Sequence, residues 1–391
     1  MRHTFKVNVG LFRQSLGTVR QSLSRPGARW IVGAAGGVVI VTALAIGLIL
    51  VPSGSGSSPI LPSPSDSPSP SPSPTPAPPP KVASPINGVM LDRAVYESLQ
   101  AKAPLAIMIE NHPDARPQSG LNQADLVYEA IAEGGITRFM AVYWSTEAAR
   151  IQYVRSARIY YIQWAAELSA VYCHWGQVED PGPVDVWPVL ARLNVRDLNG
   201  LILGEEVGYR DESRYAPHNV FTDTGLLWRS AQAHSFSGPP VVEAWKFKED
   251  EPQRAGNPAE RLAPVVNVTF GSPGSEFDVV WNYDPATNGY LRSMGGAPHT
   301  DATTGEQVSA RDIAVQFAPL RPSGIKAYNI IDTVGTGSSV IFQDGVAKVG
   351  TWRKDSESGR TRFFDAIGQE IPFDRGRTWI EVVPTDSPVG Y

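Results

Sequence analysis

The residues best suited to chemistry in this 391-residue sequence stand at 155–158, which read Arg-Ser-Ala-Arg. Ser156 is a favoured N-cap residue, and apolar residues follow at helical spacing, so a helix is predicted to begin there. Free N–H groups, the positive end of the helix dipole and the guanidinium groups of Arg155 and Arg158 would together bind a phosphate or carboxylate. The alternative is that both arginines pair with carboxylates of their own domain.

A second polar segment, 210–219, adds residues to this predicted anion site. Pro217 restricts the residue before it and presents His218 and Asn219 at a defined angle. If the protein is catalytic, the arginines stabilise phosphoryl charge and His174 or His218 acts as general base. The predicted ligand-binding residues are Arg155, Ser156, Arg158, Arg214, His218 and Asn219.

Other reactive side chains give weaker signals. His112, His174 and His218 lie far apart without metal-ligand spacing, so no metal site is predicted, and no cofactor is identified. A Gly-rich phosphate loop and a G-x-S-x-G elbow are both missing from the sequence. The single cysteine, Cys173, has no partner for an intrachain disulfide and is predicted to be a small buried hydrophobe.

The elements that position these residues belong to a predicted first domain at 84–240. Strand patterns alternate there with helix patterns, which indicates an α/β or α+β layered domain with ligands at strand ends and helix N-termini. The strands are expected at 105–110, 125–132, 136–144 and 170–174, and the helices from 156, near 184–193 and near 226–234.

A polar connector at 241–262 leads to a β-rich second domain at 263–386. Repeated strand and turn signals there favour a β-sandwich or a rolled sheet. Its aromatic residues either line a carbohydrate-binding face or pack in the core, and strand spacing favours the core. They are Trp281, Tyr283, Tyr290, Trp352 and Trp379.

The N-terminal region predicts a membrane anchor. Residues 1–29 hold six Lys or Arg and no acidic residue, and 30–51 is an uncharged apolar run long enough to cross a bilayer as one helix. A Pro/Ser-rich linker of extended polyproline type follows at 52–83. The basic flank places the N-terminus in the cytoplasm and the folded part outside the cell membrane, while a cleaved signal peptide is the alternative.

The net charge of the chain is −5, although residues 1–29 carry six Lys or Arg and no acidic residue. The part after the run is therefore more acidic still. Nucleic acid is excluded as a sequence-independent partner, because such binding needs a broad basic face.

Three segments carry a family resemblance: PLAIMIENHPDARPQSGLNQADLVYEAIAEGGITRFMAVY, VRSARIYYIQWAAELSAVYCHWG and YAPHNVFT. With GTW and RTWIEVVP further on, they resemble the YerB-like lipoprotein family, whose two parts are domains of unknown function. The resemblance covers about 84 to 385 and implies an envelope protein outside the cytoplasm. The chain departs from the family by a membrane helix in place of a lipidated cysteine, and by Trp and Gln in His-Trp-Gly-Gln at 174–177.

The order of elements is also similar to that of LytR-CpsA-Psr phosphotransferases, which bind polyprenyl pyrophosphate with arginines and are anchored by one N-terminal helix. This similarity is one of order and topology. The sequence thus predicts a membrane-anchored envelope protein that binds an anionic, phosphate-bearing ligand. Cell-wall glycopolymer, lipid pyrophosphate and wall-synthesis enzymes are the expected partners. The alternatives are a non-catalytic adaptor or scaffold for wall-synthesis enzymes and a carbohydrate-binding module.

Overall fold

The structure is a computed structural model that describes residues 80–391 except 181, 252–260 and 272–273. The helix predicted at 30–51 and nearly all of the Pro/Ser linker lie outside these residues. Among the described helices, none combines the length and apolar character that a bilayer crossing requires.

An eleven-stranded sheet dominates the described part of the chain. Its central strands β18, β25, β4, β5 and β3 are nearly or completely buried, which explains why they read as apolar runs. From one edge the order is β12 (Arg261–Leu262), β22 (Val346–Lys354), β21 (Gly335–Gln343), β18 (Asp312–Ala318), β25 (Thr378–Pro384), β4 (Leu126–Glu133), β5 (Ile136–Tyr143), β3 (Leu105–Glu110), β7 (Val171–His174) and β8 (Arg196–Asn199), with β23 (Arg362–Asp365) beside β22.

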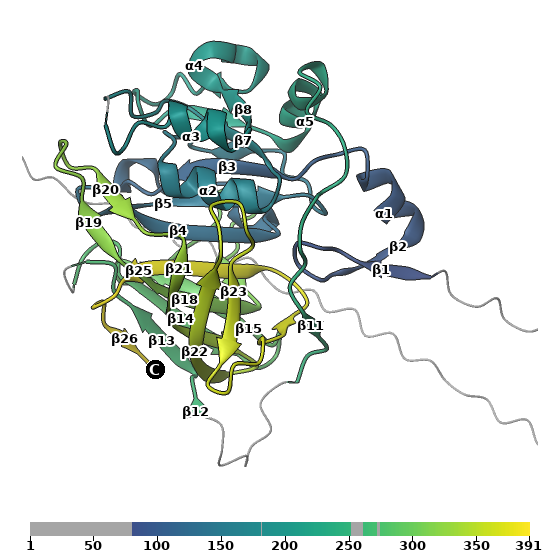
Figure 1. Cartoon of the computed structure of the whole chain (residues 1–391), viewed down its shortest axis with the longest axis vertical. Coiled ribbons are helices and arrows are strands. Elements are labelled where there is room, and N and C mark those ends of the chain that lie inside the picture. The colour runs from purple at the N-terminus through teal and green to yellow at the C-terminus, as the bar shows by residue number, and fades with distance from the viewer. Residues whose placement is uncertain (1–79, 181, 252–260, 272–273) are drawn as a thin grey trace, which may run out of the picture. The chain divides into compact units, whose positions relative to one another are not determined.

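The two parts of the chain meet inside this sheet. Strand β25 runs parallel to β4 on one side and parallel to β18 on the other. Figure 1 shows β25, in yellow, directly beside the blue β4. The first part is α/β and the second part is β-rich, as predicted, but four long strands of the second part extend the sheet of the first.

Helices α2 (Ile159–Glu167) and α3 (Trp187–Arg192) cover one face of the sheet (Figure 1). Tyr161 and Trp164 of α2 are fully buried and belong to the same apolar cluster as Tyr128 and Met140 of the sheet. Burial of such large aromatic side chains is a major source of stability. Backbone hydrogen bonds join the segment before α2 to β3, through Arg155 N–H and Met108 O, and to the residues after β7, through Ala157 N–H and Gly176 O.

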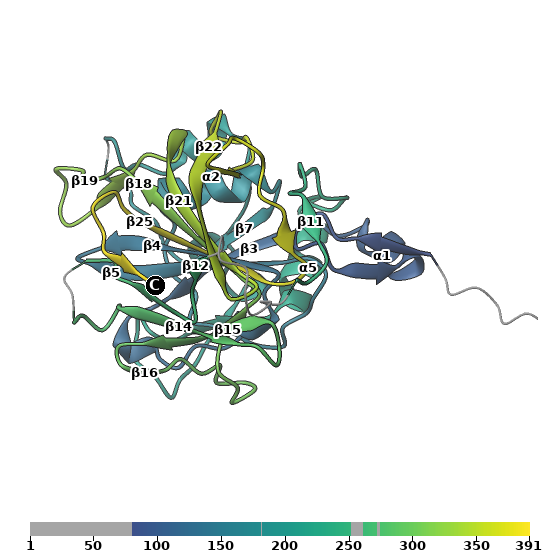
Figure 2. The ribbon, with the colours of Figure 1, turned by 90° about the horizontal axis from the view of Figure 1, so that it is seen from below.

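A second sheet packs on the opposite face and appears as a separate layer in Figure 2. Its Trp281 meets Trp379 of β25 edge to face, with ring centroids 5.3 Å apart. Helix α5 (Thr224–Ala233) also contributes Trp228 to this core. The strands are β16 (Ala297–Pro298), β15 (Gly289–Met294), β14 (Val279–Asp284), β13 (Val265–Val268) and β26 (Val389–Gly390), with β17 (Ser309–Ala310) beside β15.

Shorter elements complete the described chain. The helical ones are α1 (Arg93–Leu99), α4 (Gly200–Leu203) and the 3-10 turns η1 (Pro113–Ala115), η2 (Leu121–Gln123) and η3 (Gly204–Glu206). The strands are β1 (Lys81–Ala83), β2 (Met90–Asp92), β6 (Ile151–Gln152), β9 (Tyr209–Arg210), β10 (Val220–Thr222), β11 (Phe247–Lys248), β19 (Leu320–Pro322), β20 (Asn329–Ile331) and β24 (Phe373–Asp374).

One expectation needs correction. Ser156 does not cap a helix, because α2 begins at Ile159 and Arg158 occupies the N-cap position without a side-chain cap. The residues before α2 are extended instead, with the N–H of Arg155 bonded to Met108 O at 3.0 Å.

The aromatic residues of the second part pack in the core, as their strand spacing indicates. Trp281, Tyr290, Trp352 and Trp379 are at most 1% exposed, and Tyr283 is partly buried.

Candidate ligand-binding site

The carboxylate of Glu110 joins two residues of the predicted site. Glu110 is the last residue of β3 and is almost completely buried. Its Oε1 lies 3.0 Å from Arg155 Nε, and its Oε2 accepts a hydrogen bond from His218 Nδ1 at 3.0 Å. The end of β3, the segment before α2 and the loop between β9 and β10 therefore converge at this carboxylate.

A second group of contacts covers this junction on the solvent side. The rings of His112 and His218 stack with centroids 4.8 Å apart. The hydroxyl of Tyr215 donates to Asp114 Oδ2 at 2.7 Å, and Arg214 Nη1 donates to the carbonyl oxygen of Asp114 at 2.6 Å. The hydrogen bond from Tyr215 is the main cause that lowers the pKa of Asp114, with the nearby His112, His218 and Arg214 also contributing.

Two arginines, Arg210 at the end of β9 and Arg214 in the loop that follows, have no ion pair with any described residue. Arg210 donates to Asn219 Oδ1 at 2.8 Å and lies over the Trp175 ring, and Arg214 lies over the Tyr153 ring. No carboxylate of the described residues is within ion-pair distance of either guanidinium group. Arg210 is exposed and Arg214 is partly exposed. Both therefore keep donors that an anion in solution can reach.

The side chain of Arg158 does not contact Glu110 but forms an ion pair with Glu133. It is 5% exposed, and its Nη2 lies 2.6 Å from Glu133 Oε2. The buried Arg138 binds the other oxygen of the same carboxylate. Burial would raise the pKa of Glu133, but the two guanidinium groups outweigh it and lower this pKa. The interpretation of Arg158 as a partner of a carboxylate in its own domain thus agrees with the geometry.

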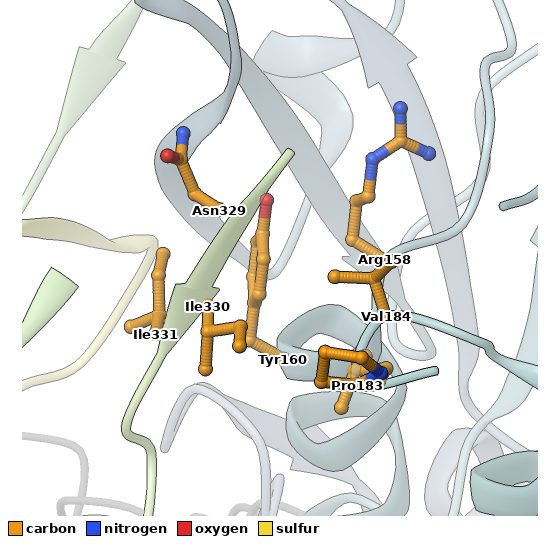
Figure 3. A pocket seen from close by; sticks show the side chains of 8 residues that line it. Arg158, Tyr160, Pro183, Val184, Asn329, Ile330 and Ile331 are labelled. Atoms are coloured by element: carbon orange, nitrogen blue, oxygen red, sulfur yellow. The ribbon is translucent and has the colours of Figure 1, made fainter. Parts of the chain in front are cut away.

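The neighbouring pocket, shown in Figure 3, offers little to an anion. It is lined largely by apolar side chains, including Val184, Ile330 and Ile331. The guanidinium group of Arg158 points away from Pro183 and Ile330 in this view.

His174 and Ser156 lie at the end of β7 rather than at the Glu110 junction. His174 is fully buried, with Nδ1 2.7 Å from Gly176 O and Nε2 2.9 Å from Asp197 Oδ1. Both ring nitrogens face oxygen atoms, so neither is free to take a proton from a substrate. Ser156 Oγ donates to Trp175 O at 3.4 Å, and a Cβ on Gly176 would stand 2.9 Å from this hydroxyl oxygen.

Sequence reasoning did not assign Asp114, Tyr215 or Arg210 to the site. The signal available in the sequence was the polar run Glu-Asn-His directly after a buried strand, at 110–112. Tyr215 and Asp114 stand 101 positions apart, and no local pattern connects them. Of the predicted residues, the structure joins Arg155, Arg214, His218 and Asn219 around one loop.

Comparisons with known proteins agree with this fold. The N-terminal domain model of a protein family of unknown function, DUF3048, matches residues 92–237, and the C-terminal domain model of that family matches 266–380. A protein of Bacillus subtilis (strain 168) with the name "Putative lipoprotein YerB" is 28% identical over 309 residues, which cover 78% of this chain and 87% of the relative.

A crystal structure of the YerB protein from Bacillus subtilis superposes on this chain with a TM-score of 0.68 and 28% identity. The alignment covers 80% of this chain and all of that chain. The two family models match residues in both parts of the chain. The chain therefore belongs to the YerB-like family, whose two-part DUF3048 domain has no known function.

Proposed function

We propose that this chain is an extracytoplasmic cell-envelope protein, held at the membrane by residues 30–51, that binds an anionic, phosphate-bearing ligand. The observation that carries the ligand class is the pair Arg210 and Arg214, which have no carboxylate partner among the described residues. The relative YerB is named a lipoprotein, which supports a membrane-bound protein outside the cytoplasm. The predicted helix is a different kind of anchor from a lipid.

The ligand in this proposal contacts Arg210 and Arg214 and not Arg155 or Arg158. Arg155 and Arg158 are neutralised by Glu110 and Glu133, so an anion would have to displace a carboxylate to reach either. Arg214 has no ion pair among the described residues, and the carboxylates that its charge acts on, Asp114 and Asp211, are beyond ion-pair distance. The same loop carries His218 and Asn219, whose buried side chains are bonded to Glu110 and Arg210. Guanidinium groups bind phosphate oxygens with charge-assisted hydrogen bonds.

Arg155 and Arg158 have a supporting role in this proposal. Arg155 fixes one oxygen of Glu110, so that the other oxygen orients the imidazole of His218. Ser156 and Arg158 hold the extended segment before α2 against Trp175 and Glu133.

The test is a binding measurement on the full-length protein in detergent. Inorganic pyrophosphate and a short-chain polyprenyl pyrophosphate are titrated by calorimetry, and the matching polyprenyl alcohol is the uncharged control. Loss of one charge-assisted hydrogen bond is worth about 1.5–3 kcal/mol, so Arg214→Ala is expected to weaken pyrophosphate binding about 10- to 100-fold. Arg321→Ala, which removes an exposed arginine paired with Asp332, is the matched control and should leave binding unchanged.

Absence of pyrophosphate binding to the wild type, or equal affinity in Arg214→Ala and Arg321→Ala, would contradict the anion-binding proposal. Equal affinity for the alcohol and the pyrophosphate would contradict the role of the phosphate. A non-catalytic adaptor for wall-synthesis enzymes is then the functional hypothesis that remains.

A further inference from the structure

The loops that meet at Glu110 also bring together a set of metal-ligand side chains from distant parts of the chain. We propose that His112, Asp114 and His218 bind one divalent transition-metal ion, with zinc as the best match. This proposal does not depend on anion binding, because it rests on the donor atoms and their supports alone.

The donor set has the composition of a zinc site. Each of the three residues offers one ligand atom, and these atoms all lie within 4.8 Å of one another. Two imidazole nitrogens and one carboxylate oxygen suit zinc better than calcium or magnesium, which prefer oxygen ligands. Three protein ligands leave a fourth tetrahedral position for solvent, as in catalytic zinc sites.

The distances already approach those of a tetrahedral site. Zinc bonds of about 2.0–2.1 Å place neighbouring ligand atoms about 3.3 Å apart. His112 Nδ1 and Asp114 Oδ2 are 3.5 Å apart, so this pair requires almost no movement. To bind an ion, His112 and Asp114 would move together toward His218. This shift breaks the hydrogen bond that His112 Nδ1 accepts from the N–H of Asp114 at 3.2 Å. There is room for it at the surface, since the side chain of His112 is 33% exposed and that of Asp114 is 49% exposed.

The third ligand is held in place by its surroundings. His218 Nδ1 donates to Glu110 Oε2, which leaves Nε2 as the nitrogen available to a metal ion. A carboxylate bonded to the second nitrogen of a ligand histidine orients the ring and increases its basicity. Arg155 fixes Glu110 in turn.

Contacts around Asp114 complete the outer support. Its Oδ2 accepts from the hydroxyl of Tyr215, and its carbonyl oxygen accepts from Arg214. Both donors come from the loop that carries His218. The sequence spacing of the histidines does not indicate a metal site, but His112 and His218 stack on each other because the end of β3 and the start of β10 lie beside the same segment, residues 152–155.

The experiment uses the full-length, untagged protein, treated with EDTA and dialysed. Zinc is titrated by calorimetry in a buffer without phosphate, and cobalt(II) is added in parallel because its visible absorption reports the number and type of ligands. The wild type is expected to bind one equivalent of zinc and to give the spectrum of a four-coordinate cobalt ion with nitrogen and oxygen ligands.

Four variants separate the ligands from their supports. His112→Ala and Asp114→Asn change exposed or partly exposed side chains and should each weaken zinc binding at least 10-fold. Glu110→Gln should weaken it about 10- to 100-fold with the cobalt spectrum retained, as expected of a positioning residue. His234→Ala removes an exposed histidine that is 3.1 Å from Glu206, and it is the matched control with unchanged affinity.

Two results would overturn the metal site: no cobalt spectrum of a four-coordinate ion with the wild type, or zinc affinities of His112→Ala and Asp114→Asn equal to that of His234→Ala. Pyrophosphate binding is measured without added metal. Failure of one proposal is therefore distinguishable from failure of the other.

Discussion

Replacement of Arg292 by Met tests whether the two parts of the chain share one polar core. Arg292 stands on β15 and is fully buried, and its Nη2 lies 2.5 Å from Oε2 of the equally buried Glu129 on β4. Its Nη1 lies 2.6 Å from His299 Nδ1. Glu129 also accepts from Thr137 Oγ1 at 2.7 Å. The substitution therefore leaves a carboxylate without its cation between the two sheets.

Two titratable neighbours of this pair are uncharged in the wild type. Burial is the main cause that lowers the pKa of His299 well below its usual value, and Arg292 adds to it, so this imidazole is neutral. Burial and the charge of Glu129 raise the pKa of Glu381 well above its usual value, so this carboxyl is neutral as well. Removal of one partner of a buried pair costs about 3–5 kcal/mol, and we expect Arg292→Met to lower the free energy of unfolding by this amount.

The assay is urea unfolding of the full-length protein, followed by tryptophan fluorescence. Arg353→Met is the matched control, because Arg353 pairs with Asp355 at 3.3 Å with both side chains more than half exposed. Exposed pairs contribute about 0–1 kcal/mol. The double variant Arg292→Met, Glu129→Gln removes the stranded charge and should recover part of the loss. A loss below about 1 kcal/mol in Arg292→Met, or no recovery in the double variant, would refute the reasoning.

Two further predictions concern titration and reactivity. Burial and the charge of Asp344 raise the pKa of Asp374 to about 7, although Lys248 attracts this carboxylate. The stability that comes from this protonated carboxyl is therefore complete below the unfolded-state pKa and is lost as the pH rises through about 7. Between pH 5 and pH 8 the free energy of unfolding should fall more in the wild type than in Asp374→Asn, and an equal fall in both would contradict this. Cys173 is 1% exposed and burial raises the pKa of its thiol, so a maleimide should label it only after unfolding, and rapid labelling of the native protein would contradict its burial.

Individual strands were predictable because their sequence signal is local. All six residues of β3 are buried, and they form the apolar run that marked 105–110 as a strand. The strand expected at 136–144 differs by one residue from β5. The parallel neighbours of β25 were not predictable, because alternation or apolarity does not specify which distant strand will be the partner.

The candidate site was predictable in its residue types and less so in its contacts. The polar segment at 210–219 carries the predicted Arg214 and also Arg210, and within the described part of the chain neither forms an ion pair. Ser156 failed as an N-cap because the capping signal is local, whereas the chain before α2 is held by hydrogen bonds to Met108 O and Gly176 O. The approach of His112 to His218 depends on two loops that only the complete sheet brings together.

The position of β25 constrains how the protein can be made. This strand is synthesised after every other strand of the largest sheet, yet it fills the place between β18 and β4. Until residues 378–384 have emerged, β4 presents an unpaired apolar edge, and such edges promote aggregation. A premature stop codon shortly before Thr378 would leave β4 and β18 uncovered and remove Trp379 from the core. Such a product would be cleared or would aggregate, and it would not persist as a shorter version of the protein.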